Sequence, residues 1–176
     1  LSDESRVMGA AEYVAFPTSA EEIGDVIRWC AAHDVPLTAQ GGLTGLAGGA
    51  SPARGLALNL QRMNRILGLK RDDRGRYCLR VQPGLLLAQL RKALETRSFD
   101  VRGWDEASLE TLKGIKPGAL FFSPDPTEPT ASLGGMASCN ACGARSFLYG
   151  CTRAHITALR VVLADGRVAS LMRGRD

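Results

Sequence analysis

A glycine-rich stretch carries the pattern with the clearest chemical meaning in this 176-residue sequence: Gln40-Gly41-Gly42-Leu43-Thr44-Gly45-Leu46-Ala47-Gly48-Gly49-Ala50. Glycine adopts backbone conformations that other residues avoid, and it lets a bulky ligand touch the main chain directly. Consecutive N–H groups in such a loop form a concave site for anions, and Thr44 adds a hydroxyl donor. The loop is therefore a candidate site for a pyrophosphate.

Two familiar phosphate-binding motifs do not match this loop. A Walker A motif needs a Lys-Ser/Thr pair after its last glycine, whereas Ala50 follows Gly49 here. In the Rossmann fingerprint the glycines open a helix, whereas here the next regular pattern is a strand at Gly55–Leu60. We therefore expect a strand–loop–strand context. From the loop alone, a mobile surface loop without a ligand stays open as the alternative.

A second cluster of small residues follows a proline-fixed turn. The turn is Phe122-Ser123-Pro124-Asp125-Pro126-Thr127, and the cluster is Leu133-Gly134-Gly135-Met136-Ala137-Ser138-Cys139-Asn140-Ala141-Cys142-Gly143. Small side chains let a backbone lie flat against a planar ring system, and the Asn140 amide has groups that suit a ring or ribose edge. The alternative, which the residues leave equally open, is a tightly packed start of a helix with no ligand.

Composition and charge exclude several classes of protein. With 45% hydrophobic and 23% charged residues the chain is typical of a globular domain, and no stretch approaches the ~20 apolar residues of a membrane span. Residues 1–9 lack the apolar core of a signal peptide, so we expect a soluble cytoplasmic protein, and the missing initiator Met indicates a fragment. The net charge of +4 suits an anionic ligand, while scattered basic residues without interleaved aromatic ones argue against nucleic-acid binding.

The sequence has five cysteines and no secretory signal, which favours reduced thiols over a disulfide framework. Cys139 and Cys142 form a CxxC pair, but no second pair exists and neither His33 nor His155 has zinc-finger spacing. We therefore expect no metal site. Small buried residues beside a tight backbone are the favoured interpretation, and dithiol or metal chemistry is the minor alternative.

The expected elements begin with a β-α-β unit. Ser19 and Glu22 form a capping box, and the apolar residues that follow are spaced as on one face of a helix. Asp165-Gly166 between two alternating runs predicts a hairpin. The predicted strands are 14–17, 35–39, 55–60, 77–81, 156–163 and 167–172, and the predicted helices are 20–33, 86–97 and 105–113, the last within the least legible stretch, residues 98–118.

Taken in order, these blocks resemble the FAD-binding domain of the vanillyl-alcohol oxidase (PCMH) type, especially its glycolate oxidase, D-lactate dehydrogenase and D-2-hydroxyglutarate dehydrogenase branch. The resemblance spans roughly residues 13–171. It rests on Phe16-Pro17-Thr18-Ser19-Ala20-Glu21-Glu22, Gln40–Gly49, Asn64-Arg65-Ile66-Leu67, Val81-Gln82-Pro83-Gly84, Pro124-Asp125-Pro126-Thr127, Leu133-Gly134-Gly135-Met136, Asn140-Ala141, Gly143, Tyr149-Gly150 and Leu163-Ala164-Asp165-Gly166. Each block alone is weak, and the ordered set is specific.

The resemblance implies an α+β fold with two lobes: a small β-α-β-β lobe over residues 1–64 and a larger mixed sheet with flanking helices over 65–176. A C-terminal substrate domain is expected to lie outside this chain. The implied FAD-binding residues are Gln40, Gly41, Gly42, Leu43, Thr44, Gly45 and Gly49 at the pyrophosphate, Pro124, Asp125, Thr127, Gly134, Gly135, Ser138, Asn140 and Gly143 along the flavin, and Ile156 at the adenine end.

The sequence departs from the family pattern at three places. Many relatives carry a histidine in the first loop that bonds covalently to the flavin, and Leu43 and Thr44 stand there instead, so we expect non-covalent FAD. Cys142 replaces a smaller residue, and its sulfur is expected to crowd the cofactor. The stretch 98–118 is longer than the usual link and is expected to form an excursion specific to a subfamily.

By resemblance, the expected reaction is oxidation of a small 2-hydroxy acid by hydride transfer to FAD. We assign no catalytic residue, because in relatives the base and the carboxylate-binding arginine come mainly from the substrate domain, and neither His33 nor His155 is well placed. Expected partners are FAD, the hydroxy acid, and a substrate domain or partner subunit, with a location in the cytoplasm or at the inner membrane within a complex. Two alternatives are a non-catalytic flavin-binding subunit and a reductase of the enolpyruvyl sugar nucleotide type.

Overall fold

The computed structural model of the protein describes residues 2–174, and its internal contacts divide the chain into two compact units. The first unit contains Leu1–Met63 together with Ile156–Asp176, and the second contains Asn64–His155. The stretch after Ile156, which was assigned to the larger lobe, instead groups with the first unit because its hairpin packs against the first helix.

Three parallel strands form the sheet of the first unit. They are β1 (Tyr13–Ala15), β2 (Leu37–Gln40) and β3 (Leu56–Asn59), in the order β1-β3-β2. All four residues of β3 are buried, as expected for a central strand of a parallel sheet. The glycine loop leaves the end of β2 and returns to the start of β3, so the predicted strand–loop–strand context is confirmed.

Helix α1 (Ala20–Ala32) supplies the apolar face that covers this sheet. Ile23 and Cys30 of α1 are buried against Leu56, Leu58 and Met63. The helix begins at Ser19, whose hydroxyl accepts a hydrogen bond from the Glu22 N–H at 3.1 Å. The Glu22 carboxylate bonds to the N–H of Thr18 at 2.7 Å rather than to that of Ser19, so the predicted capping box is shifted by one residue on that side.

Replacing Ser19 with alanine is expected to lower the free energy of unfolding by about 1 kcal/mol, because the Glu22 N–H loses its acceptor at the helix start. Urea denaturation followed by circular dichroism measures this. Ser98→Ala is the matched control, since Ser98 is exposed and its hydroxyl has no hydrogen bond among residues 2–174. Equal stability of the two variants would contradict the capping role.

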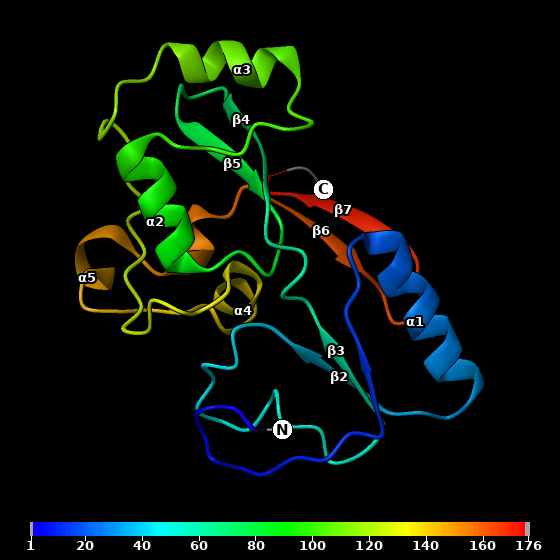
Figure 1. Cartoon of the computed structure of the whole chain (residues 1–176). Helices are drawn as coiled ribbons and strands as arrows, with labels where there is room; N and C mark the ends of the chain where they lie inside the picture. The colour runs from blue at the N-terminus through cyan, green and yellow to red at the C-terminus, as the bar shows by residue number, and fades with distance from the viewer. Residues whose placement is uncertain (1, 175–176) are drawn as a thin grey trace. The chain divides into compact units, whose positions relative to one another are not determined.

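The predicted hairpin after Ile156 consists of β6 (Ala158–Val162) and β7 (Val168–Met172), which pair antiparallel around Asp165-Gly166. Gly166 has φ +79°, a conformation that glycine adopts at little cost. The hairpin lies beside α1 (Figure 1), and the Arg28 guanidinium donates to the Gly166 carbonyl at 3.0 Å. Arg160 of β6 forms an ion pair with Glu21 of α1 at 2.7 Å.

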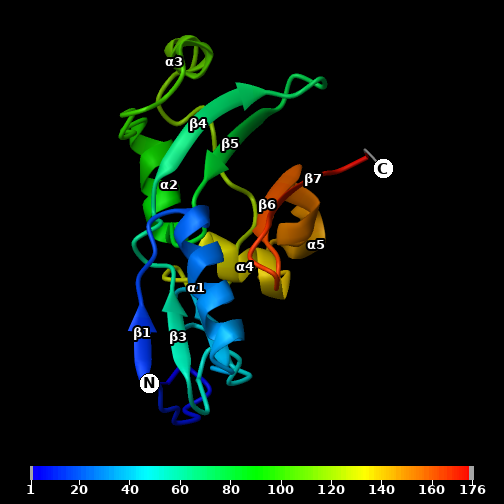
Figure 2. The same ribbon diagram turned by 90° about the vertical axis from the view of Figure 1, so that its right-hand side faces the viewer.

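The second unit begins with the antiparallel pair β4 (Ile66–Arg71) and β5 (Tyr77–Val81), drawn as two neighbouring arrows in Figure 2. Its helices are α2 (Leu87–Thr96), α3 (Glu106–Lys113), α4 (Leu133–Cys139) and α5 (Ser146–Tyr149), followed by a 3-10 turn η1 (Thr152–His155). The core gathers Ile66, Leu69, Leu85, Leu90, Leu94, Trp104 and Ile115.

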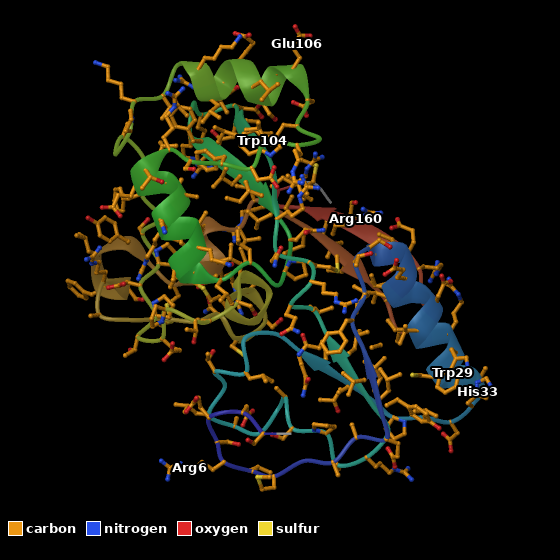
Figure 3. The ribbon with its side chains drawn as sticks, viewed as in Figure 1. Arg6, Trp29, His33, Trp104, Glu106 and Arg160 are labelled. Atoms are coloured by element: carbon orange, nitrogen blue, oxygen red, sulfur yellow. A yellow bond between two sulfur atoms is a disulfide. The ribbon has the colours of Figure 1, made fainter. Side chains whose placement is uncertain are left out.

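The stretch 98–118 contributes Trp104 and Ile115 to this core. Trp104 is buried, and its indole N–H donates to the Ile66 carbonyl at 2.8 Å (Figure 3). Asp105 caps the predicted helix α3 by accepting from the Ser108 N–H at 2.7 Å, and the Ser108 hydroxyl accepts from the Leu69 N–H at 3.2 Å. Over residues 2–174, the protein has no helix with the length and apolar character that crossing a bilayer requires.

Candidate functional site

Gln40, the last residue of β2, fixes the two ends of the glycine loop. Its side chain is 2% exposed, its Nε2 donates to the Ala50 carbonyl at 2.8 Å, and its Oε1 accepts from Asn59 Nδ2 at 3.4 Å. Gln40 was predicted to bind the cofactor. In the structure its amide is used inside the protein, where it ties the end of the loop to the sheet.

The middle of the loop is exposed at Gly45, Leu46, Ala47 and Gly49. Among the described residues, the backbone N–H groups from Leu43 to Gly49 have no acceptor within the protein. Space is available beside them: a Cβ on Gly49 would meet nothing within 4 Å, and one on Gly45 would meet only Asp3 Oδ2, at 3.6 Å. Leu43 has φ +58°, in the left-handed region that residues other than glycine rarely adopt. Such a row of unpaired donors is what an anion-binding loop requires.

The N-terminal segment holds this loop at both ends, which the sequence analysis did not predict. The Asp3 carboxylate accepts from the Ala50 N–H at 3.3 Å, and the Glu4 N–H donates to the Leu43 carbonyl at 3.2 Å. A hydrogen bond from the Ser5 hydroxyl lowers the pKa of the Asp3 carboxyl, so it is ionised at neutral pH. The spacing of Asp3 and Ser5, typical of an Asx turn, was the available signal.

In the second unit the proline turn and the later small residues do come together. Pro126 and Gly143 form an isolated antiparallel bridge, and a Cβ on Gly143 would overlap the Asp125 carbonyl. The Asp125 carboxylate contacts the guanidinium groups of Arg91 and Arg145. Protein contacts therefore explain the lack of a side chain at Gly143 without a ligand.

A similar packing reason applies to the start of α4. Ser132 caps this helix by accepting from the Gly135 N–H at 3.2 Å, and a Cβ on Gly134 would lie 2.7 Å from Pro83 Cβ. The Ser138 hydroxyl donates to the Gly134 carbonyl at 2.9 Å. The packed helix start that the sequence left open as an alternative is thus present here, with Ser138 exposed at its far end.

Three more predicted site residues have distinct surroundings. Asn140 ends α4 with φ +48°, and its side-chain oxygen accepts from the Arg153 N–H at 2.9 Å, so that oxygen joins α4 to η1. Thr127 is exposed next to the Pro126–Gly143 bridge. Ile156 is half-buried in the first unit, directly before β6.

Comparison with known proteins decides the family. A family model described as an FAD binding domain matches residues 11–102 and 110–171, which is most of the chain. The chain belongs to this FAD-binding domain family. The interruption at 103–109 falls inside the stretch 98–118, where the sequence analysis expected a departure from the family pattern.

Curated relatives agree with this assignment. The chain is 34% identical over 172 residues to a D-lactate dehydrogenase of Anaerostipes hadrus, covering 96% of this chain and 31% of that protein. It is 31% identical over 157 residues to glycolate oxidase subunit GlcD of Bacillus subtilis, covering 88% and 28%. It is 31% identical over 163 residues to D-2-hydroxyglutarate dehydrogenase of Stutzerimonas stutzeri, covering 92% and 30%. The chain spans less than a third of the length of each.

Solved structures confirm the predicted α+β fold class. A chitooligosaccharide oxidase superposes with a TM-score of 0.69 at 20% identity, covering 98% of this chain and 32% of that one. The 6-hydroxy-D-nicotine oxidase of Arthrobacter nicotinovorans superposes with a TM-score of 0.68 at 18% identity, with the same coverage. At these identities the likeness shows the fold alone.

Within this FAD-binding domain the expectation of unpaired thiols is wrong for one pair. Cys142 and Cys151 form a disulfide with a Cα–Cα distance of 4.8 Å. The same two segments are also joined by Thr152, whose hydroxyl donates to the Ala141 carbonyl at 2.7 Å. That contact brings the two cysteines close, and Cys139 stays a free, exposed thiol.

Replacing Cys142 and Cys151 with serine is expected to lower the free energy of unfolding by about 2 kcal/mol, because the cross-link closes a short loop in the unfolded chain. Urea unfolding without reductant measures the change. Cys139→Ser should unfold like the original protein, and a reducing agent should bring the original protein to the stability of the double variant. A protein insensitive to reductant would contradict the pairing.

Each histidine of the domain has one ring nitrogen within hydrogen-bond distance of a main-chain carbonyl. His33 Nδ1 lies 2.8 Å from the Trp29 carbonyl, and its ring stacks on Trp29 at 4.5 Å between centroids (Figure 3). His155 Nε2 lies 2.9 Å from the Tyr149 carbonyl. These contacts orient both rings, and we assign a catalytic role to neither.

Proposed function

We propose that this domain binds FAD non-covalently and that its glycine loop grips the two linked phosphates. The observation that supports this most is the row of unpaired N–H groups from Leu43 to Gly49 among the described residues, with open space at Gly49. Such donors, held in place by the protein, favour a charged oxygen over water. Gln40 acts behind the loop, by fixing Ala50, rather than at the ligand.

The attachment is proposed as non-covalent because no side chain of the loop can form a stable bond to the flavin ring. The loop offers Leu43, Thr44, Leu46 and Ala47 besides glycine, where a histidine would be needed. We also propose the predicted residues of the second unit as flavin contacts: Pro124, Asp125, Thr127, Gly134, Gly135, Ser138, Asn140 and Gly143. Ile156 is proposed as a contact of the adenine end.

The proposed activity is oxidation of a small 2-hydroxy acid. D-lactate, glycolate and D-2-hydroxyglutarate appear in the names of relatives at 31–34% identity, and all three carry a hydroxyl next to a carboxylate. FAD, when bound, supplies a hydride acceptor, and the residues of this chain hold and orient it. We assign no substrate-binding residue to this chain.

Titration of the purified protein with FAD, followed by flavin fluorescence, tests the binding. FAD is expected to bind at least about tenfold more tightly than riboflavin, because riboflavin lacks the diphosphate that the loop N–H groups would hold. ADP, which has the diphosphate without the flavin, is expected to compete. Acid precipitation should release all flavin into the supernatant. Equal affinity for FAD and riboflavin would contradict the role of the loop.

The substrate class is tested separately, with the whole protein that contains this domain. Anaerobic addition of D-lactate, glycolate or D-2-hydroxyglutarate is expected to bleach the absorbance of the bound flavin. The matching control acids are propionate, acetate and glutarate, which lack the hydroxyl. Bleaching by none of the hydroxy acids would contradict the proposed substrate class and leave FAD binding unaffected.

A further inference from the structure

A buried carboxylate lies against the glycine loop. Asp3 is 6% exposed, although aspartate side chains are rarely buried in proteins. Its Oδ1 accepts from the N–H of Ser5 at 3.0 Å and from the Ser5 hydroxyl, and its Oδ2 accepts from the Ala50 N–H at 3.3 Å. Its own N–H donates to the Ser51 hydroxyl at 3.3 Å.

The donors around Asp3 explain how a carboxylate can be buried there. Burying an ionised group is costly unless it is paired or hydrogen-bonded. Among the described residues Asp3 forms no ion pair, and its partners are N–H and hydroxyl groups only. Two of its hydrogen-bond partners, Ala50 and Ser51, lie 47 and 48 residues from Asp3 in the sequence. The carboxylate is therefore a tertiary link and not only a local turn.

These connections reach both ends of the stretch whose N–H groups are unpaired. At one end the Glu4 N–H holds the Leu43 carbonyl, and at the other Asp3 holds Ala50. Gly48 lies along the same segment, since a Cβ there would be 3.5 Å from the Ser5 hydroxyl. A loop fixed at both ends before the ligand arrives loses less conformational entropy on binding.

We propose that Asp3 is a positioning residue for the phosphate-binding loop. Its carboxylate and the adjacent main chain clamp Leu43 and Ala50, so that the N–H groups between them stay directed away from the protein. The inference rests on the proposed FAD binding and adds a residue that touches no ligand. It also explains why an acidic side chain is placed beside a loop that binds an anion.

A purely electrostatic effect of the Asp3 carboxylate and a positioning effect would change FAD affinity in opposite directions, so the two can be told apart by experiment. A carboxylate near a diphosphate repels it, so removal of the charge alone would tighten FAD binding. Loss of a clamp would weaken FAD binding, because the loop must then be ordered by the ligand. Glu4 is the matched control, since it carries the same charge one residue away, is exposed, and has no side-chain hydrogen bond among residues 2–174.

The experiment compares the original protein with Asp3→Ala, Asp3→Asn and Glu4→Ala in two measurements. Hydrogen exchange by mass spectrometry over residues 41–51 reports loop order without any ligand, and FAD titration reports affinity. Asp3→Ala is expected to speed exchange in this peptide and to weaken FAD binding by about tenfold, as when one partner of a buried hydrogen bond is removed. Asp3→Asn keeps one acceptor oxygen and is expected to fall between, and Glu4→Ala to match the original.

Each outcome bears on a stated claim. Unchanged exchange and unchanged affinity in Asp3→Ala would overturn the positioning role, as would tighter FAD binding than in the original protein. Faster exchange over the whole chain in Asp3→Ala, rather than over 41–51, would also overturn it, since Asp3 would then support general stability. If the original protein takes up no FAD, the proposed function is overturned instead. Faster hydrogen exchange over residues 41–51 in Asp3→Ala, but not in Glu4→Ala, would still support the clamp.

Discussion

Gly143→Ala is expected to lower the free energy of unfolding by about 3 kcal/mol or more, because the new methyl group would overlap the Asp125 carbonyl. The overlap involves main-chain atoms of the Pro126–Gly143 bridge, so no flexible side chain can move aside to relieve it. Urea unfolding followed by circular dichroism gives the value. Loss of bound FAD is expected to accompany it if this turn contacts the flavin.

Gly114→Ala is the matched control for this substitution. Gly114 ends α3 in the same unit with φ −75°, and a Cβ there would meet only the Thr111 carbonyl, at 3.8 Å. It is expected to change the free energy of unfolding by less than about 0.5 kcal/mol, as is usual at surface positions without special geometry. A Gly143→Ala protein as stable as Gly114→Ala would show that the bridge is not packed as described.

Leu43→Pro is expected to weaken FAD binding roughly a hundredfold. Proline has no N–H and holds φ near −65°, whereas Leu43 has φ +58° and offers an unpaired N–H at the proposed phosphate site. Loss of one charge-assisted hydrogen bond costs about 1.5–3 kcal/mol, and each 1.4 kcal/mol corresponds to tenfold in affinity. Flavin fluorescence titration measures the change, and circular dichroism verifies that the variant is folded.

Leu43→Gly separates the two causes. Glycine keeps the N–H and adopts a positive φ freely, so FAD affinity is expected to stay within a few-fold of the original. If Leu43→Pro and Leu43→Gly bound FAD equally well, the N–H of this residue would have no part in binding. A weakened Leu43→Gly protein would indicate instead that the leucine side chain itself matters.

The glycines of the two clusters have different physical roles, although they look alike in sequence. At Gly49 a side chain would meet open space, so protein packing does not explain the glycine, and the proposed ligand would. At Gly134 and Gly143 a side chain would collide with Pro83 or Asp125, so protein packing alone requires glycine there. We therefore base the proposed function on the first cluster and treat contacts of the second with FAD as predictions to be tested.

Most regular elements could be predicted from local patterns. The strand Tyr77–Val81 was placed without error because alternation and Pro83-Gly84 mark its end, and α1 and α3 followed from their caps. A helix at α4 was only one of two interpretations that the sequence left open, since Gly134 and Gly135 are poor helix formers. Its start is stabilised by the Ser132 cap and by close packing on Pro83, which local propensity does not include.

The sequence by itself determined the family pattern and the α+β class, and it marked the Gln40–Ala50 loop as a candidate anion site, because glycine spacing and apolar periodicity act over a few residues. Only the tertiary structure decided which partners those residues meet. The Asp3–Ala50 link, the pairing of Cys142 with Cys151, and the packing of the β6–β7 hairpin on α1 join segments whose closeness is set by the fold. Contacts between such distant segments form only when both find their place in a packed core, and no local pattern encodes that.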